Sequence, residues 1–206
     1  MAKHPVSGLT GNIGAGKSTV GAMLRELGAR VIDSDATVRT LLESDATVQR
    51  RVREAFPSAQ RPDGGIDRAA VAREVFADRE KLTRLQDLLY PAVGEATDAL
   101  LAEATDAPAT FIEAINVVEG PSGLRLDGLW LVEADPAVLV ERVAASGRLS
   151  AAEVQARLAM QAGPEEKAEA FRRLRPGRPI VRLNNNGSLE ELRTQVTARW
   201  IDLLAG

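Results

Sequence analysis

The sequence contains no cysteine and only one histidine, His4, which stands close to the amino terminus. Without cysteine the chain cannot form a disulfide, a thiolate nucleophile or a cysteine-ligated metal site. With a single histidine, a histidine-based acid/base pair is not expected either. The absence of disulfides is typical of a reducing compartment, so we expect a cytoplasmic protein. Its chemistry has to come from carboxylates and cations.

Long apolar runs are also missing from the sequence. Residues 1–9 lack the apolar core of a signal peptide, and no apolar run approaches the roughly 20 residues that cross a bilayer. The formal net charge of -3 and the pI of about 5.4 give no overall attraction to nucleic acid. We therefore expect a soluble monomer or small homo-oligomer that binds small molecules, with neither membrane nor nucleic acid as a partner.

What the sequence does contain is an alternation of short apolar runs and helical patterns. Residues 6–10 and 30–32 are typical of buried strands, and each is followed by apolar residues at helical spacing. Residues 111–118, 129–132 and 180–183 are further apolar runs suited to central parallel strands. This order predicts an α/β fold with three layers, in which helices cover both faces of a five-stranded parallel sheet.

Between residues 47 and 105 the apolar spacing is helical throughout, which predicts a helical insertion. Asp67 is well placed to cap the helix that follows it. Two further segments match the capping-box pattern, Ser150 to Glu153 and Ser188 to Glu191, so helices should begin near residues 151 and 189.

The strongest chemical signal is the segment Gly11-Asn12-Ile13-Gly14-Ala15-Gly16-Lys17-Ser18, which matches G-x-x-x-x-G-K-[ST] in full. In such a loop the glycines let successive backbone N–H groups turn inward around phosphate oxygens. Lys17 would face the β- and γ-phosphates of ATP, Ser18 would offer its hydroxyl to Mg²⁺, and Thr19 would follow on the helix. The motif therefore predicts binding of ATP with Mg²⁺.

Other nucleotide-binding motifs fit the chain less well. The dinucleotide pattern G-x-G-x-x-G, started at Gly14, would need a glycine where the chain has Thr19. The N-K-x-D segment expected of a GTPase is absent, and Asn184-Asn185-Asn186-Gly187 does not match it. An ATP-dependent phosphotransferase remains the best interpretation.

Asp33 and Asp35 follow the second apolar run, at the sheet edge where parallel α/β proteins bind ligands. A carboxylate there can accept a proton from an attacking hydroxyl or help to hold Mg²⁺, although either residue could simply cap the next helix. Three arginines, Arg142, Arg148 and Arg157, could stabilise charge on the transferred phosphoryl group or could be ordinary surface residues. One basic run is expected to be solvated or to form a weakly anion-attracting rim: Lys167, Arg172, Arg173, Arg175, Arg178 and Arg182.

Taken in order, these features resemble the dephospho-CoA kinase family over nearly the whole chain. Two segments are the most specific for this family: residues 8–20, and the D-x-D segment Asp33-Ser34-Asp35 together with Arg39. Further matches follow in order and spacing: Gly65-Ile66-Asp67-Arg68, Val75-Phe76, Arg157 with Gln161, and Asn186-Gly187-Ser188-Leu189.

The resemblance implies transfer of the ATP γ-phosphate to the ribose 3′-hydroxyl of dephospho-CoA, with Mg²⁺, on a P-loop kinase fold. It divides the chain into a first core segment (1–46), a helical acceptor subdomain (47–108) and a second core segment (109–206) with a lid at about 142–175. It makes Asp33 the general base, with Lys17 and Arg142 as catalytic cations, and it places Asn186 and Gly187 beside the adenine. The implied acceptor contacts are Asp35, Arg39, Arg68, Tyr90 and Glu119.

The chain departs from the family pattern at three places. Tyr90-Pro91 stands where the family usually has His-Pro, and residues 115–119 stand where it has P-L-L-F-E, so that only Glu119 is shared. Ser146 occupies the usual position of a lid arginine. Two alternatives therefore stay open: a kinase of another small molecule or nucleoside monophosphate, and a nucleotide-binding protein whose acceptor site has decayed.

Overall fold

The computed structural model describes residues 4–75, 78–147 and 149–205. The family match Phe76 and the candidate arginine Arg148 lie outside these ranges. The chain divides into two compact units, the first formed by residues 1–33 and 104–206 and the second by residues 34–103. In the described ranges, no helix is long and apolar enough to cross a bilayer.

Unit 1 contains a five-stranded sheet in which all strands are parallel, with the order β2-β3-β1-β4-β5. This confirms the predicted sheet. The strands are β1 (Val6–Thr10), β2 (Arg30–Asp33), β3 (Thr110–Glu113), β4 (Gly128–Glu133) and β5 (Ile180–Asn184).

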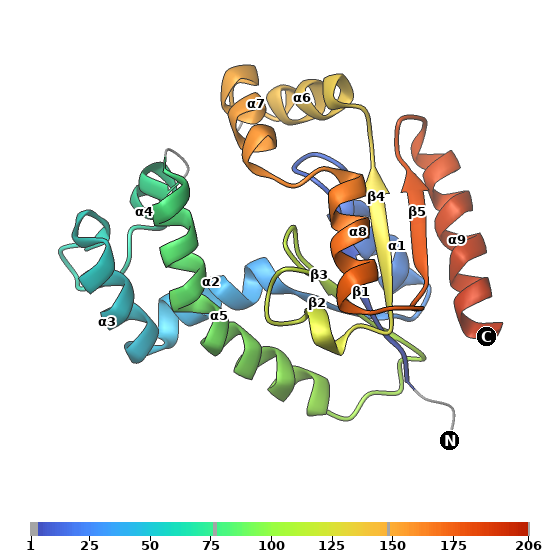
Figure 1. Cartoon of the computed structure of the whole chain (residues 1–206), viewed down its shortest axis with the longest axis horizontal. Helices are drawn as coiled ribbons and strands as arrows, with labels where there is room; N and C mark the ends of the chain where they lie inside the picture. Colours follow the sequence, from blue (N-terminus) through green and yellow to red (C-terminus); the bar gives the residue numbers. More distant parts are fainter. Residues whose placement is uncertain (1–3, 76–77, 148, 206) are drawn as a thin grey trace. The chain divides into compact units, whose positions relative to one another are not determined.

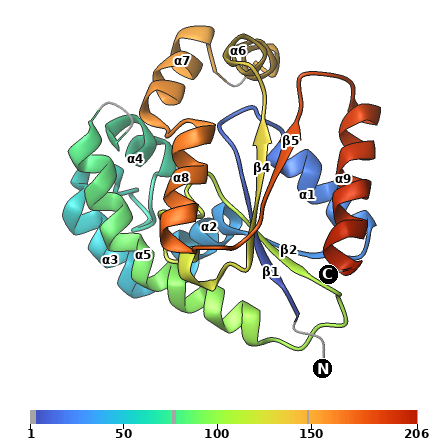
Figure 2. The same cartoon turned by 45° about the vertical axis from the view of Figure 1, so that its right-hand side comes forward.

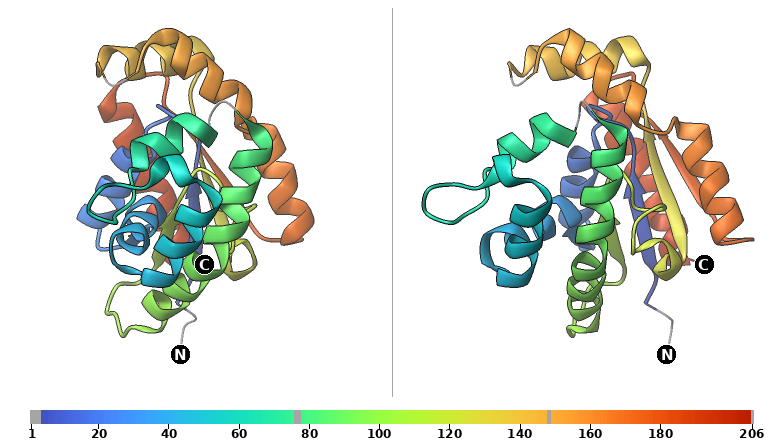
Figure 3. Two further views of the ribbon diagram at one scale, coloured as in Figure 1. Left: turned by 90° about the vertical axis from the view of Figure 1, so that its left-hand side faces the viewer. Right: turned by 60° about the vertical axis from the view of Figure 1, so that its left-hand side comes forward.

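Helices cover both faces of this sheet and form the other two layers. Figure 1 shows α8 in front of β4 and α1 behind the sheet, and Figure 2 shows α9 on the same side as α1. Figure 3 shows α6 and α7 beyond the carboxyl end of β4. The helices of unit 1 are α1 (Lys17–Glu26), α6 (Pro136–Ala145), α7 (Ala151–Met160), α8 (Pro164–Leu174) and α9 (Leu189–Ala205).

Alternating side chains of the strands fill the space under the helices. Trp130 and Val132 of β4 belong to the core beneath α1 and α9, and the Trp130 ring meets Phe111 of β3 edge to face at a centroid distance of 5.1 Å. Leu129 and Leu131, which alternate with them, point to the opposite face and are fully buried. Burial on both faces explains why each strand appears in the sequence as an almost continuous apolar run.

One predicted strand is shorter than its apolar run. We expected a strand over residues 111–118, but β3 ends at Glu113 and the chain then turns, with the Gly120 N–H donating to the Asn116 carbonyl at 2.8 Å. Val117 and Val118 are nevertheless buried. An apolar run records burial and not conformation, so a buried turn was mistaken for strand. The polar Asn116 consequently stands in a turn and not inside the sheet.

Unit 2 is helical, as the apolar spacing predicts. Its core gathers side chains from each of the α-helices that the structure describes there, with Phe56 and Val52 almost completely buried. The predicted cap is confirmed, since Asp67 Oδ1 accepts from the N–H groups of Ala69 and Ala70 at 2.9 and 3.0 Å. The elements are α2 (Ser34–Ser44), α3 (Ala46–Ala55), the 3₁₀ turn η1 (Pro57–Ala59), α4 (Arg68–Val75) and α5 (Arg79–Ala102).

Candidate active site

The glycine motif connects the end of β1 to the start of α1. Residues 11–16 form the turn between them, and α1 begins at Lys17 with Gly16 as its N-cap. This arrangement aims the N–H groups of the first helical turn, and the positive end of the helix dipole, at the loop. The strand, loop and helix order expected of a phosphate-binding loop is therefore present.

Two of the glycines are required by their surroundings as well as by their backbone angles. Gly14 has a φ of 78°, and a Cβ there would lie 3.0 Å from the Leu139 carbonyl oxygen of α6. Gly16 has a φ of 97°, and a Cβ would lie 2.3 Å from Nδ2 of Asn185. Any larger residue would strain the backbone and collide with the neighbouring element. The loop is thus closely enclosed on both sides.

Side chains from two distant segments fix the loop through its backbone. Asn185, which follows β5 and is largely buried, donates from Nδ2 to the Ala15 carbonyl at 2.8 Å. Gln161, which follows α7, accepts from the Ile13 N–H through Oε1 at 2.9 Å. Both bonds hold the loop in its curved form before a ligand arrives, which lowers the entropy cost of binding.

Lys17, expected to face the ATP phosphates, and Ser18, expected to hold Mg²⁺, are the first two residues of α1. Lys17 Nζ donates to the Asn12 carbonyl at 3.3 Å, so its ammonium lies over the loop. Ser18 is exposed on the first turn of the helix. The residues described include no cluster of three or more carboxylates or histidines that could hold a metal ion. A Mg²⁺ site here would rely on Ser18 together with nucleotide phosphates and water, which is how Mg²⁺ is commonly held.

A small cavity of about 270 Å³ opens beside the loop. Its lining includes Gly14, Gly16 and Thr19, together with Arg142 of α6. Nη1 of Arg142 is buried and has no hydrogen-bond partner in the part of the chain that the structure describes, and the same holds for Oδ1 of Asn12. A buried guanidinium donor without a partner is rare, and here it belongs to an arginine that lines a cavity beside a loop built to bind anions.

The segment after β5 forms another wall of this cavity. Asn185 and Gly187 line it, whereas the side chain of Asn186 bonds to the residue that precedes α6: Oδ1 accepts from the Asp135 N–H at 2.7 Å, and Nδ2 donates to the Asp135 carboxylate at 3.1 Å. Asn186 thus joins the loop after β5 to the start of α6. The structure brings Gly187, Arg142 and the phosphate-binding loop together.

Asp33 is the last residue of β2 and pairs in register with Glu113, the last residue of β3. Register partners on neighbouring parallel strands point to the same face of the sheet. A Cβ built on Gly21 of α1 would lie 2.8 Å from Oε2 of Glu113, so this face is the one that α1 covers. Asp33 therefore stands at the carboxyl edge of the sheet, on the side of α1.

The other predicted acceptor contacts, except Glu119, belong to unit 2. Asp35 and Arg39 lie on α2 with exposed side chains, and Tyr90 is half-buried on α5. Arg68 begins α4 and forms a long ion pair with Glu43, at 3.8 Å.

The expectation of solvated basic residues is wrong for Lys167. Its side chain is 0% exposed, and Nζ donates to the Ile115 carbonyl at 2.8 Å. Burial lowers the pKa of this ammonium, while Glu119 and Glu166 raise it less. By contrast, Arg172 and Arg182 lie near the surface and form ion pairs with Glu165, as solvated cations do.

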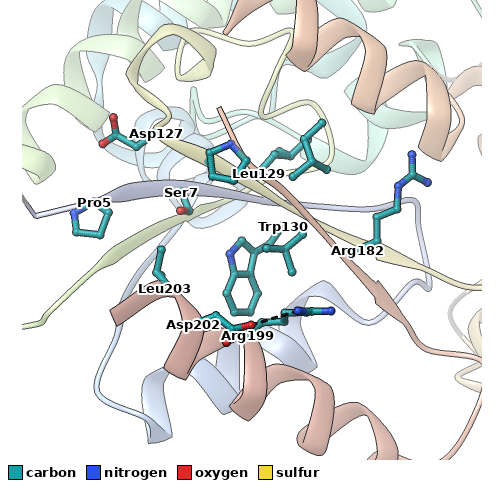
Figure 4. Close-up of a pocket in the computed structure, with 13 residues that line it drawn as sticks. Pro5, Ser7, Asp127, Leu129, Trp130, Arg182, Arg199, Asp202 and Leu203 are labelled. Carbon is teal, nitrogen blue, oxygen red and sulfur yellow. Dashed lines mark hydrogen bonds and ion pairs between the residues drawn. The ribbon is translucent and has the colours of Figure 1, made fainter. Parts of the chain in front are cut away.

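A larger cavity of about 580 Å³ lies elsewhere in unit 1, at the amino ends of β4 and β5 and against α9 (Figure 4). Trp130 and Leu203 line it, together with the ion pair between Arg199 and Asp202. No residue of the predicted site takes part. Parallel α/β folds bind their ligands at the carboxyl ends of the strands, so size alone does not identify the active site.

Sequence reasoning missed Asn185 and Glu113 as site residues. Asn185 stands between two other asparagines, and nothing in such a run marks which one will turn inward. Glu113 was hidden by the over-extended strand, because a strand over 111–118 would place it in the middle and not at the ligand-binding edge. If the strand had been predicted to end at its first charged residue, Glu113 would have been placed at the ligand-binding edge.

Comparison with known proteins gives a consistent result over the whole chain. The family model for dephospho-CoA kinase matches residues 6–189. The dephospho-CoA kinase of Geobacter metallireducens is 36% identical over 198 residues, which are 95% of this chain and 94% of that protein. The dephospho-CoA kinase of Thermus thermophilus is 38% identical over 208 residues, covering 100% and 95%.

Solved structures of similar proteins support the same fold. The crystal structure of a Thermus thermophilus protein has 37% sequence identity to this chain and a TM-score of 0.77, and the alignment covers 98% of this chain and 99% of that one. A dephospho-CoA kinase from Campylobacter jejuni, at 20% identity and a TM-score of 0.65 over 98% of both chains, supports the fold. With its phosphate-binding loop, its parallel sheet and these relatives, the chain belongs to the dephospho-CoA kinase family.

Proposed function

We propose that this ATP-dependent kinase transfers the γ-phosphate of ATP to the ribose 3′-hydroxyl of dephospho-CoA. The observation that carries the proposal is Arg142, which lines the cavity beside Gly14 and Gly16 and whose buried Nη1 has no hydrogen-bond partner among the described residues. Leaving such a donor unsatisfied costs about 1–3 kcal/mol or more, because the group is charged. A bound phosphate would satisfy it.

The phosphate-binding loop holds the ATP. Its N–H groups and the start of α1 surround the phosphate oxygens, and Lys17 neutralises charge near the β- and γ-phosphates. Ser18 would hold Mg²⁺, which when bound offsets the charge that develops on the phosphates. Gly187 borders the cavity in a position suited to the adenine of ATP. Asn186 joins the loop after β5, to which Gly187 belongs, to the start of α6.

Asp33 is the proposed general base. In the reaction the 3′-hydroxyl oxygen forms a bond to the γ-phosphorus, the bond from that phosphorus to the β–γ bridging oxygen breaks, and ADP leaves. Asp33 accepts the hydroxyl proton, and Lys17 and Arg142 stabilise the charge that spreads over the transferred group. The position of Asp33 at the carboxyl edge of the sheet, on the side of α1, supports this role.

The acceptor contacts that we propose are Asp35, Arg39, Arg68, Tyr90 and Glu119. Cationic side chains suit the diphosphate of dephospho-CoA, and a tyrosine offers a ring and a hydroxyl. The metabolic role of the family supports a cytoplasmic location, and we expect a monomer or small homo-oligomer.

An ADP-release assay with a panel of acceptors tests the proposal. Dephospho-CoA, AMP, CMP and pantetheine would each be offered with ATP and Mg²⁺. NMR of the product would identify which hydroxyl carries the new phosphate. We expect ADP release with dephospho-CoA and with none of the other acceptors, and a product phosphorylated at the 3′-hydroxyl. Turnover of AMP or CMP instead would indicate a nucleotide kinase. ATP binding without turnover of any acceptor would indicate a decayed acceptor site.

A further inference from the structure

Lys167 is a fully buried cation for which the proposed reaction has no role. It lies on the second turn of α8, beside the buried Ala168 and one turn before the buried Phe171, so it occupies the face of the helix that packs on the sheet. Lysine is almost never fully buried unless it is paired. Its contacts should therefore show what it does.

Lys167 donates a hydrogen bond to the backbone of the turn after β3. Its Nζ donates to the Ile115 carbonyl at 2.8 Å, and the Thr10 hydroxyl donates to the same oxygen at 2.7 Å. Thr10 immediately precedes Gly11, the first residue of the phosphate-binding loop. The Ile115 carbonyl therefore joins α8, the turn and the entrance to the loop at one atom.

The turn, residues 114–120, contacts β1 through its first residues. The Ala114 N–H donates to the Leu9 carbonyl at 3.1 Å, and the Gly120 N–H closes the turn on the Asn116 carbonyl at 2.8 Å. A Cβ built on Gly8 would lie 3.0 Å from Val117, so the turn packs directly on the strand. The ammonium of Lys167 fixes the first part of this segment.

Glu119 is the exposed carboxylate of the same turn, and it interacts electrostatically with Lys167. Because burial lowers the pKa of the ammonium, its charge is costly to maintain, and a purely apolar side chain would fill the same space more cheaply. A cation kept at such a position is better explained by positioning than by packing.

We propose that Lys167 is a positioning residue, which holds residues 114–120 against the end of β1 and so keeps Glu119 where it contacts the phosphoryl acceptor. The part of the inference that concerns the acceptor rests on the proposed function. The part that concerns the turn does not.

Hydrogen exchange tests the turn directly. In Lys167→Met the amides of residues 114–120 should exchange about tenfold faster than in the wild type, which corresponds to the loss of about one hydrogen bond to a charged group. Lys167→Arg, which retains a cation and donors, should restore part of the protection. Lys81→Met removes an ammonium that is paired with Glu74 in unit 2, and it should leave the exchange of residues 114–120 unchanged.

Steady-state kinetics of the same variants test the acceptor. We expect Lys167→Met to raise the KM for dephospho-CoA about tenfold, to change the KM for ATP less than about twofold, and to be partly rescued by arginine, because small displacements of a binding group have large effects. The thermal unfolding midpoint should not fall, so a lower folded fraction would not explain the change.

Unchanged exchange in residues 114–120 would overturn the inference whatever the activity. So would a loss confined to kcat, or equal increases in both KM values. If the wild type does not use dephospho-CoA, the proposed function fails, and the exchange data still decide whether Lys167 holds the turn.

Discussion

At the scale of single residues, the proposed reaction needs Asp33, the carboxylate with which β2 ends, as its general base. Asp33→Asn keeps the size and polarity of the side chain but cannot accept a proton. We expect kcat to fall about 10²-fold or more while the ATP dissociation constant changes little, because the base acts on the acceptor hydroxyl and not on ATP. Turnover assays and calorimetry measure the two quantities.

Asp106→Asn is the matched control for this prediction, since Asp106 is an exposed carboxylate in the loop before β3. It should behave like the wild type in both measurements. If Asp33→Asn retained the wild-type kcat, another group would have to accept the proton, and Glu113, its register partner, would be the next to test.

Lys167 gives a second residue-scale prediction, which concerns pH and stability. Burial lowers its pKa in the folded protein below the ordinary value of 10.5. Between these two pKa values the unfolded chain binds the proton more strongly than the folded protein, so the free energy of unfolding contributed by this residue rises with pH. The free energy of unfolding of the wild type, minus that of Lys167→Met, should therefore rise as the pH approaches the ordinary lysine pKa of 10.5 from below.

Urea unfolding of both proteins at several pH values measures this difference. Other groups that titrate in the same range are common to both proteins and cancel in the comparison. A difference that stays constant, or falls as the pH rises, would show that the folded protein does not depress the pKa of Lys167.

At the scale of elements, α4 begins on a single capping side chain. Asp67 Oδ1 accepts from two N–H groups that would otherwise have no helical partner. Asp67→Ala should lower the free energy of unfolding by about 1 kcal/mol, whereas Asp67→Asn, which caps equally well, should change it by only a few tenths. Urea unfolding followed by circular dichroism measures both. Equal losses in the two variants would mean that the negative charge matters and the cap does not.

The segment between α7 and α8 is joined to the phosphate-binding loop by Gln161. Gln161→Met keeps the length of the side chain but removes the oxygen that accepts from the Ile13 N–H at 2.9 Å. The loop would then lose one restraint, and we expect ATP to bind about fivefold more weakly, equivalent to about 1 kcal/mol for one hydrogen bond. Calorimetric titration with ATP measures the change.

Gln155→Met provides the control for Gln161, because Gln155 is exposed on α7. It should bind ATP like the wild type. An unchanged affinity in Gln161→Met would show that the loop keeps its curvature without this bond, leaving Asn185 as its main side-chain support.

Most elements could be predicted from the sequence because their signals are local. The strand before Gly11, the helix that ends before Gly28 and the capping box at Ser150 all depend on residues within one or two turns. The turn after β3 could not be predicted, since its Val117 packs on Gly8, about a hundred residues away. Local patterns record which residues are buried but not what covers them.

The same limit explains which residues of the candidate site could be predicted. The loop from Gly11 to Ser18 is contiguous and was predicted from spacing alone. Asn185 and Lys167 act on residues far away in the sequence, at Ala15 and Ile115, so no window contains both partners. Lys167 did carry a signal, because Phe171 follows it at helical spacing, which places both on the buried face of α8.

At the scale of the whole molecule, the chain leaves unit 1 where β2 ends and returns shortly before β3, so unit 2 is inserted between two neighbouring strands. The phosphate-binding loop, Asp33, Arg142 and Gly187 all belong to unit 1. Both tryptophans, Trp130 and Trp200, lie in the core of unit 1 as well. Tryptophan fluorescence therefore reports the stability of the unit that is proposed to bind ATP.

This placement leads to a prediction about ligand and stability. A ligand that binds only the folded protein stabilises it by about 2.7 kcal/mol at 100 times its dissociation constant. Saturating ATP with Mg²⁺ should therefore raise the unfolding midpoint seen by tryptophan fluorescence by several degrees. In Lys17→Ala the same concentration should give a much smaller shift, because the cation at the phosphates is gone. An equal shift in both proteins would place ATP away from the loop between β1 and α1.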